Sequence, residues 1–269
     1  MLYTAAMEFD LGQFSNLKDK DVSRMGLMVL EGRIVIEKAI AGNIEILGLI
    51  RSEASDEDWL AMHEVKFPVK RVDHEEICKI AGFHFHHGSI AIAKRPELKP
   101  FAGNEDEPRR PGSPEGSYLC LWNVTDPSNV GALIRSAAGL GAAGVLLGPG
   151  CADPYYRKAL RASMGNAFSL PLHASDAAGL SSLARGGFDL AAATLSPAAL
   201  PLSGYAPKRP FVLVVGNEGY GLPADIIDIC RGEVYIPMTP GIDSLNVVVA
   251  GGICMYELFG NRMDSIRRP

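Results

Sequence analysis

The sequence predicts an α/β protein in which a small α/β domain precedes a larger domain built on a mostly parallel sheet. Two observations predict this fold class: short apolar runs alternate with helical patterns, and a proline- and glycine-rich segment interrupts the alternation at residues 96–116. With 269 residues, of which 47% are hydrophobic, the chain has enough apolar material for a substantial core. We therefore expect domains at residues 1–95 and 117–269, joined by a linker at 96–116.

The first domain is predicted to combine a small sheet with covering helices. Short runs rich in β-branched and aliphatic residues predict its strands, and apolar residues at helical spacing predict its helices. The expected strands are residues 26–31, 44–50, 68–72 and 89–93, and the expected helices are residues 33–41 and 73–81. Residues 1–25 show no clear pattern, so no element is predicted there.

The second domain repeats one rhythm, in which a buried strand is followed by a helical pattern. Parallel neighbours need such crossover helices, so the rhythm predicts a mostly parallel sheet with helices on both faces. The run at residues 211–215 is continuously apolar, as expected for a strand buried on both sides. The expected strands are residues 118–122, 144–147, 190–193, 211–215 and 233–236, with helices at 130–138 and from about 245 to 259.

Charge and cysteine usage limit the possible functions. The net charge of −5 argues against a non-specific nucleic-acid coat, although local basic patches stay possible. Up to residue 116 there are 15 basic and 20 acidic residues, against 11 of each afterwards, so the acidity belongs to the first part. Five cysteines without a Cys-x-x-Cys pair suggest neither zinc nor a disulfide framework, and favour a reducing, cytoplasmic compartment.

The sequence contains no stretch that suits a membrane or an export signal. Crossing a bilayer takes roughly 18 to 20 apolar residues in succession, and no segment approaches that length. The amino terminus also lacks a basic region followed by an apolar one. We expect a soluble protein that is not exported.

Two patterns suggest other functions and are discounted. Residues 139–144 match Gly-x-Gly-x-x-Gly, which would indicate a nicotinamide-dependent oxidoreductase. That fingerprint must follow a strand and open a helix, whereas these glycines are predicted to end a helix. His84, His86 and His87 invite a metal site, but no nearby acidic or cysteine partner completes a ligand set, so a role in RNA contact or loop structure is favoured.

Three polar segments interrupt the apolar pattern of the second domain, at residues 123–135, 215–221 and 236–246. In the middle one, Gly-Asn-Glu-Gly directly follows the buried strand at 211–215. Open α/β sheets hold their ligands at the carboxyl ends of strands, and glycines let the backbone approach a ligand closely. This position predicts a binding loop.

The first segment precedes and enters a helix. Asp126 or Ser128 is expected to cap that helix, with a proline in its first turn. Capping does not explain Arg135, because this residue lies in the middle of the predicted helix, among apolar residues. Asn129 lies six residues earlier, close to two turns, so the two side chains could face a common site approximately. A solvated or ion-paired Arg135 is the alternative.

The third segment joins a strand to the final helix. Ser244 is expected to cap this helix, with Asn246 in its first turn. Pro237 and Pro240 stiffen the loop before it. Such a loop suits a flat, uncharged ligand moiety held by backbone groups.

Together, the three segments resemble the motifs of the SpoU/TrmH family of RNA ribose methyltransferases, members of the SPOUT superfamily. Residues 123–135 resemble the first motif, 215–222 the second and 236–250 the third, in matching order and spacing. The resemblance implies a trefoil-knotted fold for the second domain. Val29-Leu30-Glu31-Gly32 and the segment from His86 to Ala91 are similar to an L30e-like substrate-binding domain.

The resemblance implies S-adenosylmethionine as methyl donor, a ribose 2'-hydroxyl of tRNA or rRNA as acceptor, and no metal. It marks Arg135 as catalytic, with help from Asn129, Glu218, Ser244 and Asn246. Guanidinium has no acceptor site, so we expect Arg135 to bind phosphate and stabilise the developing oxyanion, and the general base stays open. Glu218 is expected to orient Asn246 or Arg135. The implied cofactor-binding residues are Thr194, Val215, Gly216, Asn217, Gly219, Ile236, Met238 and Leu245.

The resemblance also implies a homodimer built through the final helix, with Asn129 and Arg135 reaching the neighbouring subunit's cofactor. Gly251 and Gly252 inside that helix, at a cost of roughly 1 kcal/mol each, suggest close helix approach. For RNA contact we predict a basic helical face of Arg157, Lys158 and Arg161. The rival functions are a catalytically silent RNA-binding protein and the disfavoured oxidoreductase.

Overall fold

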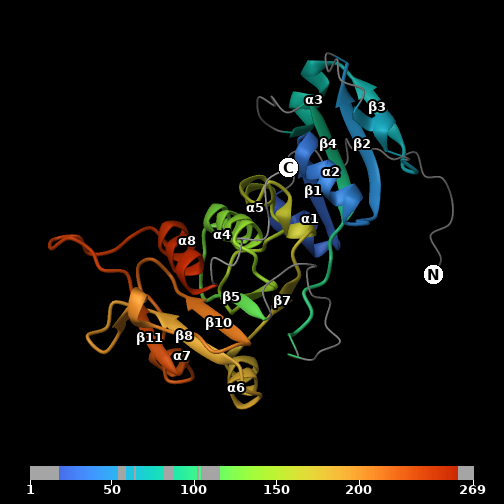
Figure 1. The fold of residues 1–269 in the computed structure, drawn as a ribbon. Helices are drawn as coiled ribbons and strands as arrows, with labels where there is room; N and C mark the ends of the chain where they lie inside the picture. Colours follow the sequence, from blue (N-terminus) through green and yellow to red (C-terminus); the bar gives the residue numbers. More distant parts are fainter. Residues whose placement is uncertain are drawn as a thin grey trace.

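The computed structural model describes residues 18–53, 59–63, 65–81, 88–101, 103 and 116–259. It contains a four-stranded sheet in the order β1-β4-β2-β3 and a seven-stranded sheet in the order β7-β6-β5-β10-β8-β11-β9. The two sheets lie in separate lobes, which meet where α5 of the larger lobe approaches α1 and β1 of the smaller one (Figure 1).

The smaller lobe has a mixed sheet. β4 runs antiparallel to both β1 and β2, whereas β3 runs parallel to β2. The strands are β1 (Leu27–Glu31), β2 (Ile46–Ser52), β3 (Val69–Val72) and β4 (Ser89–Lys94), and the helices are α1 (Asp19–Arg24), α2 (Arg33–Ala41), α3 (His74–Ala81) and the short η2 (Trp59–Met62). All six predicted elements are confirmed. α1 was not predicted, because six mostly polar residues are too few to show a helical period; Val22 alone is buried.

The larger sheet is parallel throughout. Its strands are β5 (Ser117–Leu121), β6 (Gly144–Leu147), β7 (Leu172–Ala174), β8 (Asp189–Ala193), β9 (Leu200–Pro201), β10 (Phe211–Val215) and β11 (Gly232–Tyr235). The five predicted strands are confirmed. β7 and β9 were missed because they are short edge strands without fully buried residues, so the apolar signal of a central strand is absent.

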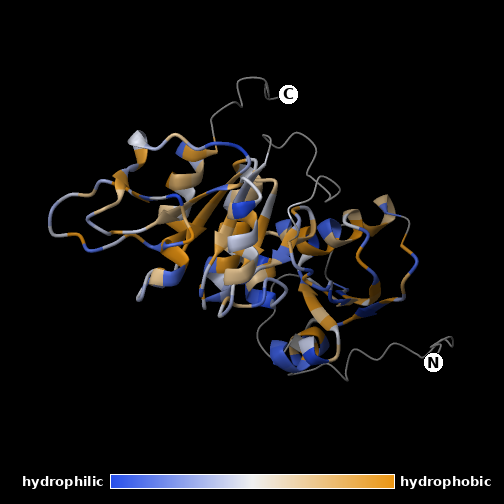
Figure 2. Ribbon diagram, turned by 90° about the horizontal axis from the view of Figure 1, so that it is seen from below, coloured by the Kyte–Doolittle hydropathy of each residue, from blue (hydrophilic) through white to orange (hydrophobic). Residues whose placement is uncertain are grey.

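Helices cover both faces of this sheet. They are α4 (Pro127–Gly139), α5 (Arg157–Ala162), α6 (Ala177–Arg185), α7 (Ala224–Ile227) and α8 (Val247–Leu258), with short turns η3 (Asn166–Phe168) and η4 (Leu202–Gly204). Alternate strand residues face opposite layers: Leu119 and Leu213 join a core with α4 and α8, whereas Cys120 and Val212 join one with α6 and α7. Figure 2 shows hydrophobic residues concentrated in the strands.

The cap of α4 agrees with prediction, and that of α8 does not. Asp126 Oδ1 accepts a hydrogen bond from Ser128 N at 2.8 Å, and Pro127 opens α4. For α8, Asn246 is the cap, since its Oδ1 accepts from Val248 N at 2.9 Å. The prediction that Ser244 caps this helix is wrong. Because the chain stays non-helical through residue 246, Ser244 is left exposed in the loop.

The glycines at residues 139–144 lie between a helix and the strand that follows it, as predicted from the sequence. Gly139 ends α4, Gly141 has a φ of +80°, and Gly144 begins β6. The glycine run therefore turns the chain from a helix into a strand, which is the reverse of the dinucleotide fingerprint.

Part of the predicted linker packs against the larger sheet. Lys99 O accepts a hydrogen bond from Ala174 N at 2.9 Å, and Phe101 N donates back to Ala174 O at 3.2 Å. The Phe101 ring is buried 4.7 Å from that of Tyr118. The start of this segment is thus anchored beside β7, and the domain boundaries at 95 and 117 stay a prediction.

Candidate active site

A cavity of about 530 Å³ lies at the carboxyl ends of β8, β10 and β11. These strands are neighbours in the sheet, so the segments that follow them converge on one place. The cavity is lined by all eight residues predicted to bind the cofactor: Thr194, Val215, Gly216, Asn217, Gly219, Ile236, Met238 and Leu245. Glu218 and Ser244 from the predicted catalytic set also line it.

The loop after β10 forms one wall and is a tight, self-bonded turn. Asn217 Oδ1 accepts hydrogen bonds from Gly219 N at 2.8 Å and Tyr220 N at 3.1 Å, and Asn217 O accepts from Gly221 N at 2.9 Å. A Cβ at Gly216 would lie 2.7 Å from the Gly221 carbonyl. The loop therefore folds back on itself only because residue 216 is a glycine.

A second wall follows β8 and contains a pair that the sequence reasoning missed. Thr194 Oγ1 donates a hydrogen bond to Glu233 Oε2 at 2.8 Å, and Thr194 N donates to Val234 O at 2.9 Å. β11, which carries Glu233, is the neighbour of β8, so the carboxylate fixes the threonine hydroxyl at the pocket edge. A glutamate inside a strand expected to be buried was the available signal.

The third wall is mostly apolar. Ile236, Met238 and Leu245 face the cavity from the loop before α8, and Val247, Ala250 and Cys254 face it from α8 itself. Burial raises the pKa of the Cys254 thiol to about 12, so this sulfur stays protonated and serves as an apolar lining group. Such a wall suits an uncharged, flat ligand moiety.

One side-chain contact joins the first and second polar segments. Asn129 Nδ2, in the first turn of α4, donates a hydrogen bond to Glu218 Oε1. β5 and β10 are adjacent, so the segments that follow them meet. The expectation that Glu218 orients Asn246 or Arg135 differs from this geometry: Glu218 contacts Asn129, and the side-chain Oδ1 of Asn246 caps α8.

Arg135 and Asn246 do not line the cavity of this chain. Arg135 is exposed on α4, about two turns beyond Asn129, and makes no hydrogen bond or ion pair with any residue that the structure describes. The structure thus brings together Asn129, Glu218, Ser244 and the cofactor set, but does not bring Arg135 or Asn246 to the cavity. An unpaired arginine is suited to a phosphate or another anion.

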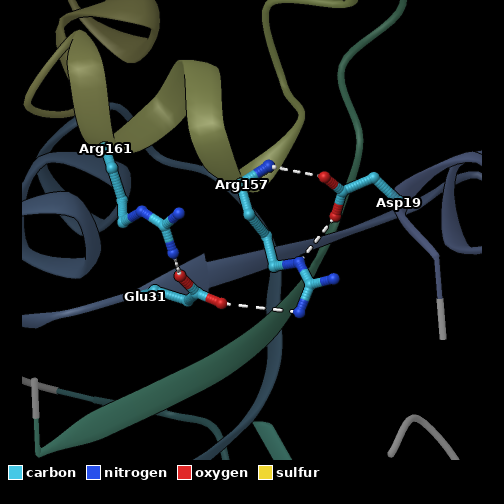
Figure 3. A network of polar contacts seen from close by, with 4 residues as sticks. All are labelled: Asp19, Glu31, Arg157 and Arg161. Atoms are coloured by element: carbon cyan, nitrogen blue, oxygen red, sulfur yellow. Dashed lines mark hydrogen bonds and ion pairs between the residues drawn. The ribbon is translucent and has the colours of Figure 1, made fainter. Parts of the chain in front are cut away.

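The two arginines of α5, Arg157 and Arg161, are engaged in ion pairs between the lobes (Figure 3). Arg157 Nε lies 2.7 Å from Asp19 Oδ1, and Arg157 N donates to Asp19 Oδ2 at 3.2 Å. Arg161 pairs with Glu31, whose second oxygen lies 3.5 Å from Arg157 Nη1. The Glu31 side chain is only 1% exposed. Two arginines therefore neutralise a carboxylate buried between the lobes.

Further polar contacts extend this interface. Arg95 Nη2 lies 2.9 Å from Asp153 Oδ2, which also accepts from Ser23 Oγ at 3.3 Å. Lys38 Nζ donates to Asn166 Oδ1 at 2.6 Å. Together with the pairs of α5, these contacts tie the smaller lobe to the region between β6 and β7.

Lys158 pairs within its own lobe. Its Nζ lies 2.9 Å from Asp126 Oδ1, and this hydrogen bond, together with that from Ser128 N, lowers the pKa of the Asp126 carboxyl. All three predicted RNA-binding cations, Arg157, Lys158 and Arg161, thus have carboxylate partners. Their contact with RNA stays a prediction, and it requires RNA phosphates to compete with those partners.

Two further structural observations concern metals and membranes. Within the described ranges, no group of three or more histidine, cysteine and acidic residues is arranged to hold a metal ion, and His84, His86 and His87 lie outside those ranges. None of the described helices combines the length and apolarity that a membrane span needs.

A cavity at the carboxyl edge of a parallel α/β sheet, lined by the second and third polar segments and by the residues after β8, is the candidate active site of an RNA methyltransferase. The chain belongs to the SpoU rRNA methylase family, whose model matches residues 116–256.

Comparison with other proteins agrees with this assignment. An uncharacterised tRNA/rRNA methyltransferase of Mycobacterium bovis is 35% identical, covering 86% of this chain and 80% of the relative. The 23S rRNA (guanosine-2'-O-)-methyltransferase RlmB of Acinetobacter baylyi is 30% identical, over 72% of this chain and 79% of RlmB. The crystal structure of an AdoMet-bound rRNA methyltransferase from Sinorhizobium meliloti has the same fold, with a TM-score of 0.77, 24% identity and 89% coverage of each chain.

Proposed function

We propose that the protein transfers the methyl group of S-adenosylmethionine to a ribose 2'-hydroxyl in tRNA or rRNA. The observation that carries the proposal is the cavity: eight residues selected by motif resemblance, from three separate segments, line one space of about 530 Å³. This volume is within the range of pockets for cofactor-sized ligands. The relatives named as 2'-O-methyltransferases and the AdoMet-bound neighbour support the same donor and acceptor.

The three walls suit the parts of this donor. The apolar wall of Ile236, Met238 and Leu245 would hold the adenine. The carboxylates of Glu218 and Asp243 at the cavity favour a positively charged sulfonium over a neutral ligand. This charge preference also favours release after transfer, because the spent cofactor is a neutral thioether.

The reaction is a direct displacement. The oxygen–carbon bond forms as the sulfur–carbon bond breaks, and the hydroxyl proton leaves to a base. Arg135 cannot accept this proton, so it would bind the neighbouring phosphate and stabilise negative charge on the oxygen. Asn129 donates a hydrogen bond to the Glu218 carboxylate at the pocket, and Ser244 and Asn246 would complete the acceptor side. The identity of the base is left open.

We further propose a homodimer built through α8. Val249, Ile253 and Tyr256 lie on one face of this helix and are 51%, 40% and 55% exposed. Gly252 faces open space on the helix, whereas a Cβ at Gly251 would lie 2.6 Å from Leu133 Cδ2 of α4. Gly251 thus serves close packing inside one chain, and Gly252 leaves room for a partner helix. A second subunit would supply the Arg135 that each cavity lacks.

The domain roles follow from the same proposal. Residues 1–95 would bind RNA, 96–116 would connect the lobes, and 117–269 would hold the donor and perform the transfer. Arg157, Lys158 and Arg161 would then lie where both lobes meet the RNA. A cytoplasmic location fits this substrate.

The function is tested by two measurements on the purified protein. Calorimetric titration should show binding of S-adenosylmethionine and none of NAD. Transfer of labelled methyl groups to bulk RNA from a strain lacking the gene should then give ribose 2'-O-methylation. Donor binding without transfer to any RNA would favour the catalytically silent RNA-binding protein.

A further inference from the structure

Tyr220 is the most exposed large hydrophobic side chain among the described residues, at 91%, and it lies at the rim of the cavity. Single exposed apolar residues are common on protein surfaces and need no explanation by themselves. Tyr220 differs because its backbone belongs to the loop that forms a wall of the donor pocket.

Hydrogen bonds within the loop and to the segment after β5 hold the backbone of Tyr220 in place. Asn217 Oδ1 accepts from the Tyr220 N–H at 3.1 Å, and the Asn217 Nδ2 donates to Asn123 O at 2.9 Å in the segment after β5. The next residue, Gly221, has a φ of +68° and closes the turn back onto Asn217. An aromatic ring on a fixed backbone loses little further freedom when a ligand covers it.

The ring also lies beside the acceptor side of the site. Glu218, two residues earlier, accepts a hydrogen bond from Asn129 of α4, the helix that carries the unpaired Arg135. A nucleotide whose ribose is held near these groups has its base, or the base of a neighbour, close to the loop. The exposed ring is thus placed to meet RNA.

We propose that Tyr220 is a substrate-binding residue that stacks on an unpaired base at or next to the methylated nucleotide. The inference rests on the proposed function and adds a feature of the substrate. Stacking on an aromatic side chain tolerates any base, because every base has a π-face, but it requires the base to be unstacked from its neighbours. Tyr220 therefore selects single-stranded or loop nucleotides and leaves base identity to other contacts.

The first test compares Tyr220→Ala with Tyr220→Phe in methyl transfer to RNA from a strain lacking the gene. Loss of one stacking partner should raise KM for RNA about 5- to 150-fold in Tyr220→Ala. Tyr220→Phe keeps the ring and should stay within about 2-fold of the wild type. The affinity for S-adenosylmethionine should be unchanged in both. Leu200→Ala, which removes another exposed apolar side chain, in the edge strand β9, is the control.

The second test reports on the contact without needing turnover. The chain has two tryptophans, Trp59 and Trp122, which are buried at 3% and 7% exposure. In Tyr220→Trp, the added exposed indole should be quenched by single-stranded oligo(A) but not by a fully paired RNA duplex. The wild-type tryptophans should respond to neither.

Three results would overturn the proposal. The first is an unchanged KM for RNA in Tyr220→Ala together with no quenching in Tyr220→Trp. The second is a loss of donor affinity in Tyr220→Ala with an unchanged KM for RNA. The third is a change in subunit association that accounts for the lost activity of Tyr220→Ala. A wild-type protein that transfers no methyl group would overturn the proposed function instead, and the fluorescence titration would still decide whether Tyr220 stacks on RNA.

Discussion

Arg135 differs from the cations of α5 in having no partner among the described residues. Arg157, Lys158 and Arg161 each pair with a carboxylate, whereas Arg135 is exposed on α4, about two turns beyond Asn129. Its charge is therefore available to substrate without first breaking an internal ion pair. This contrast supports a role in binding and stabilising the RNA oxygen that is methylated.

Replacing Arg135 by Ala should abolish most methyl transfer and leave donor binding intact. Loss of one group that stabilises transition-state charge lowers kcat by about 100- to 1,000-fold. The affinity for S-adenosylmethionine should not change, because the proposed contacts of Arg135 are with the RNA phosphate and the ribose oxygen and not with the donor. Labelled transfer and calorimetry measure the two effects, with Arg185→Ala on α6 as the control. Full activity in Arg135→Ala would contradict both roles given to this residue.

Asp189 is a buried carboxylate with a structural role, and it makes stability depend on pH. Burial alone would raise its pKa, but Arg231 at 2.5 Å, the backbone N of Lys208 at 2.7 Å and the Tyr205 hydroxyl at 3.0 Å donate to it, and the net result is a lowered pKa. A lowered pKa means that this stabilisation is complete above the unfolded value of 3.8 and is lost as pH falls through the lower folded value.

The variant Asp189→Asn should therefore be less stable than the wild type near pH 7. Its free energy of unfolding should also change less steeply as the pH falls below about 4. Urea denaturation at a series of pH values measures both effects. Equal slopes for the two proteins in this acid range would show that Asp189 does not keep a lowered pKa.

The eight residues that motif resemblance marks for the cofactor all line one cavity, and their contact with the cofactor stays a prediction. It did not predict the partners that hold those residues. The Glu233–Thr194 and Glu218–Asn129 contacts depend on which strands are neighbours, and strand order cannot be read from local pattern. The cap of α8 was mistaken because Ser244 and Asn246 are both good capping residues, and only the loop geometry selects between them.

At the level of elements, apolar runs predicted the central strands because burial on both faces leaves a continuous signal. β7 and β9 lie at the two edges of the larger sheet and carry little of that signal. The sequence predicts an RNA-binding face on α5 but not the carboxylate partners of its cations, because partners distant in the chain leave no local pattern. Asp19 and Glu31, more than 100 residues earlier, are those partners in this chain.

The contact between α5 and β1 should contribute measurably to stability. In Glu31→Gln, the charge that neutralises Arg161 and part of Arg157 is lost. Breaking a buried ion pair costs about 3 to 5 kcal/mol, and partial exposure of both arginines reduces this to about 2 kcal/mol. Urea denaturation should show the decrease. Glu75→Gln breaks an exposed pair with Lys79 and is the matched control, because its free energy of unfolding should not change. Equal stability of the Glu31→Gln and Glu75→Gln variants would refute the role of Glu31.

The exposed face of α8 should control the association of subunits. Placing a charge at the centre of an apolar interface is unfavourable, so Ile253→Glu should convert a dimer into a monomer and lower methyl transfer with it. Light scattering measures the mass, and Ile253→Leu, which keeps the apolar surface, should stay dimeric. A wild-type protein with the mass of a monomer would contradict the proposed dimer.

At the scale of the whole molecule, the ion pairs between the lobes give the donor pocket and the smaller sheet a defined relative position. The net charge of −5 excludes a general attraction to RNA, so recognition must come from a few local groups. The exposed Tyr220 at the pocket and the unpaired Arg135 on α4 are two such groups. An RNA that contacts both lobes would then be recognised by shape and by an unpaired nucleotide.

The most direct test of this account is a map of ribose 2'-O-methylation in tRNA and rRNA from cells with and without the gene. The account predicts that a discrete site is lost on deletion. It also predicts that the wild-type protein restores the site, whereas Arg135→Ala does not. An unchanged map in the deletion strain would contradict the proposal that this chain is an RNA 2'-O-methyltransferase.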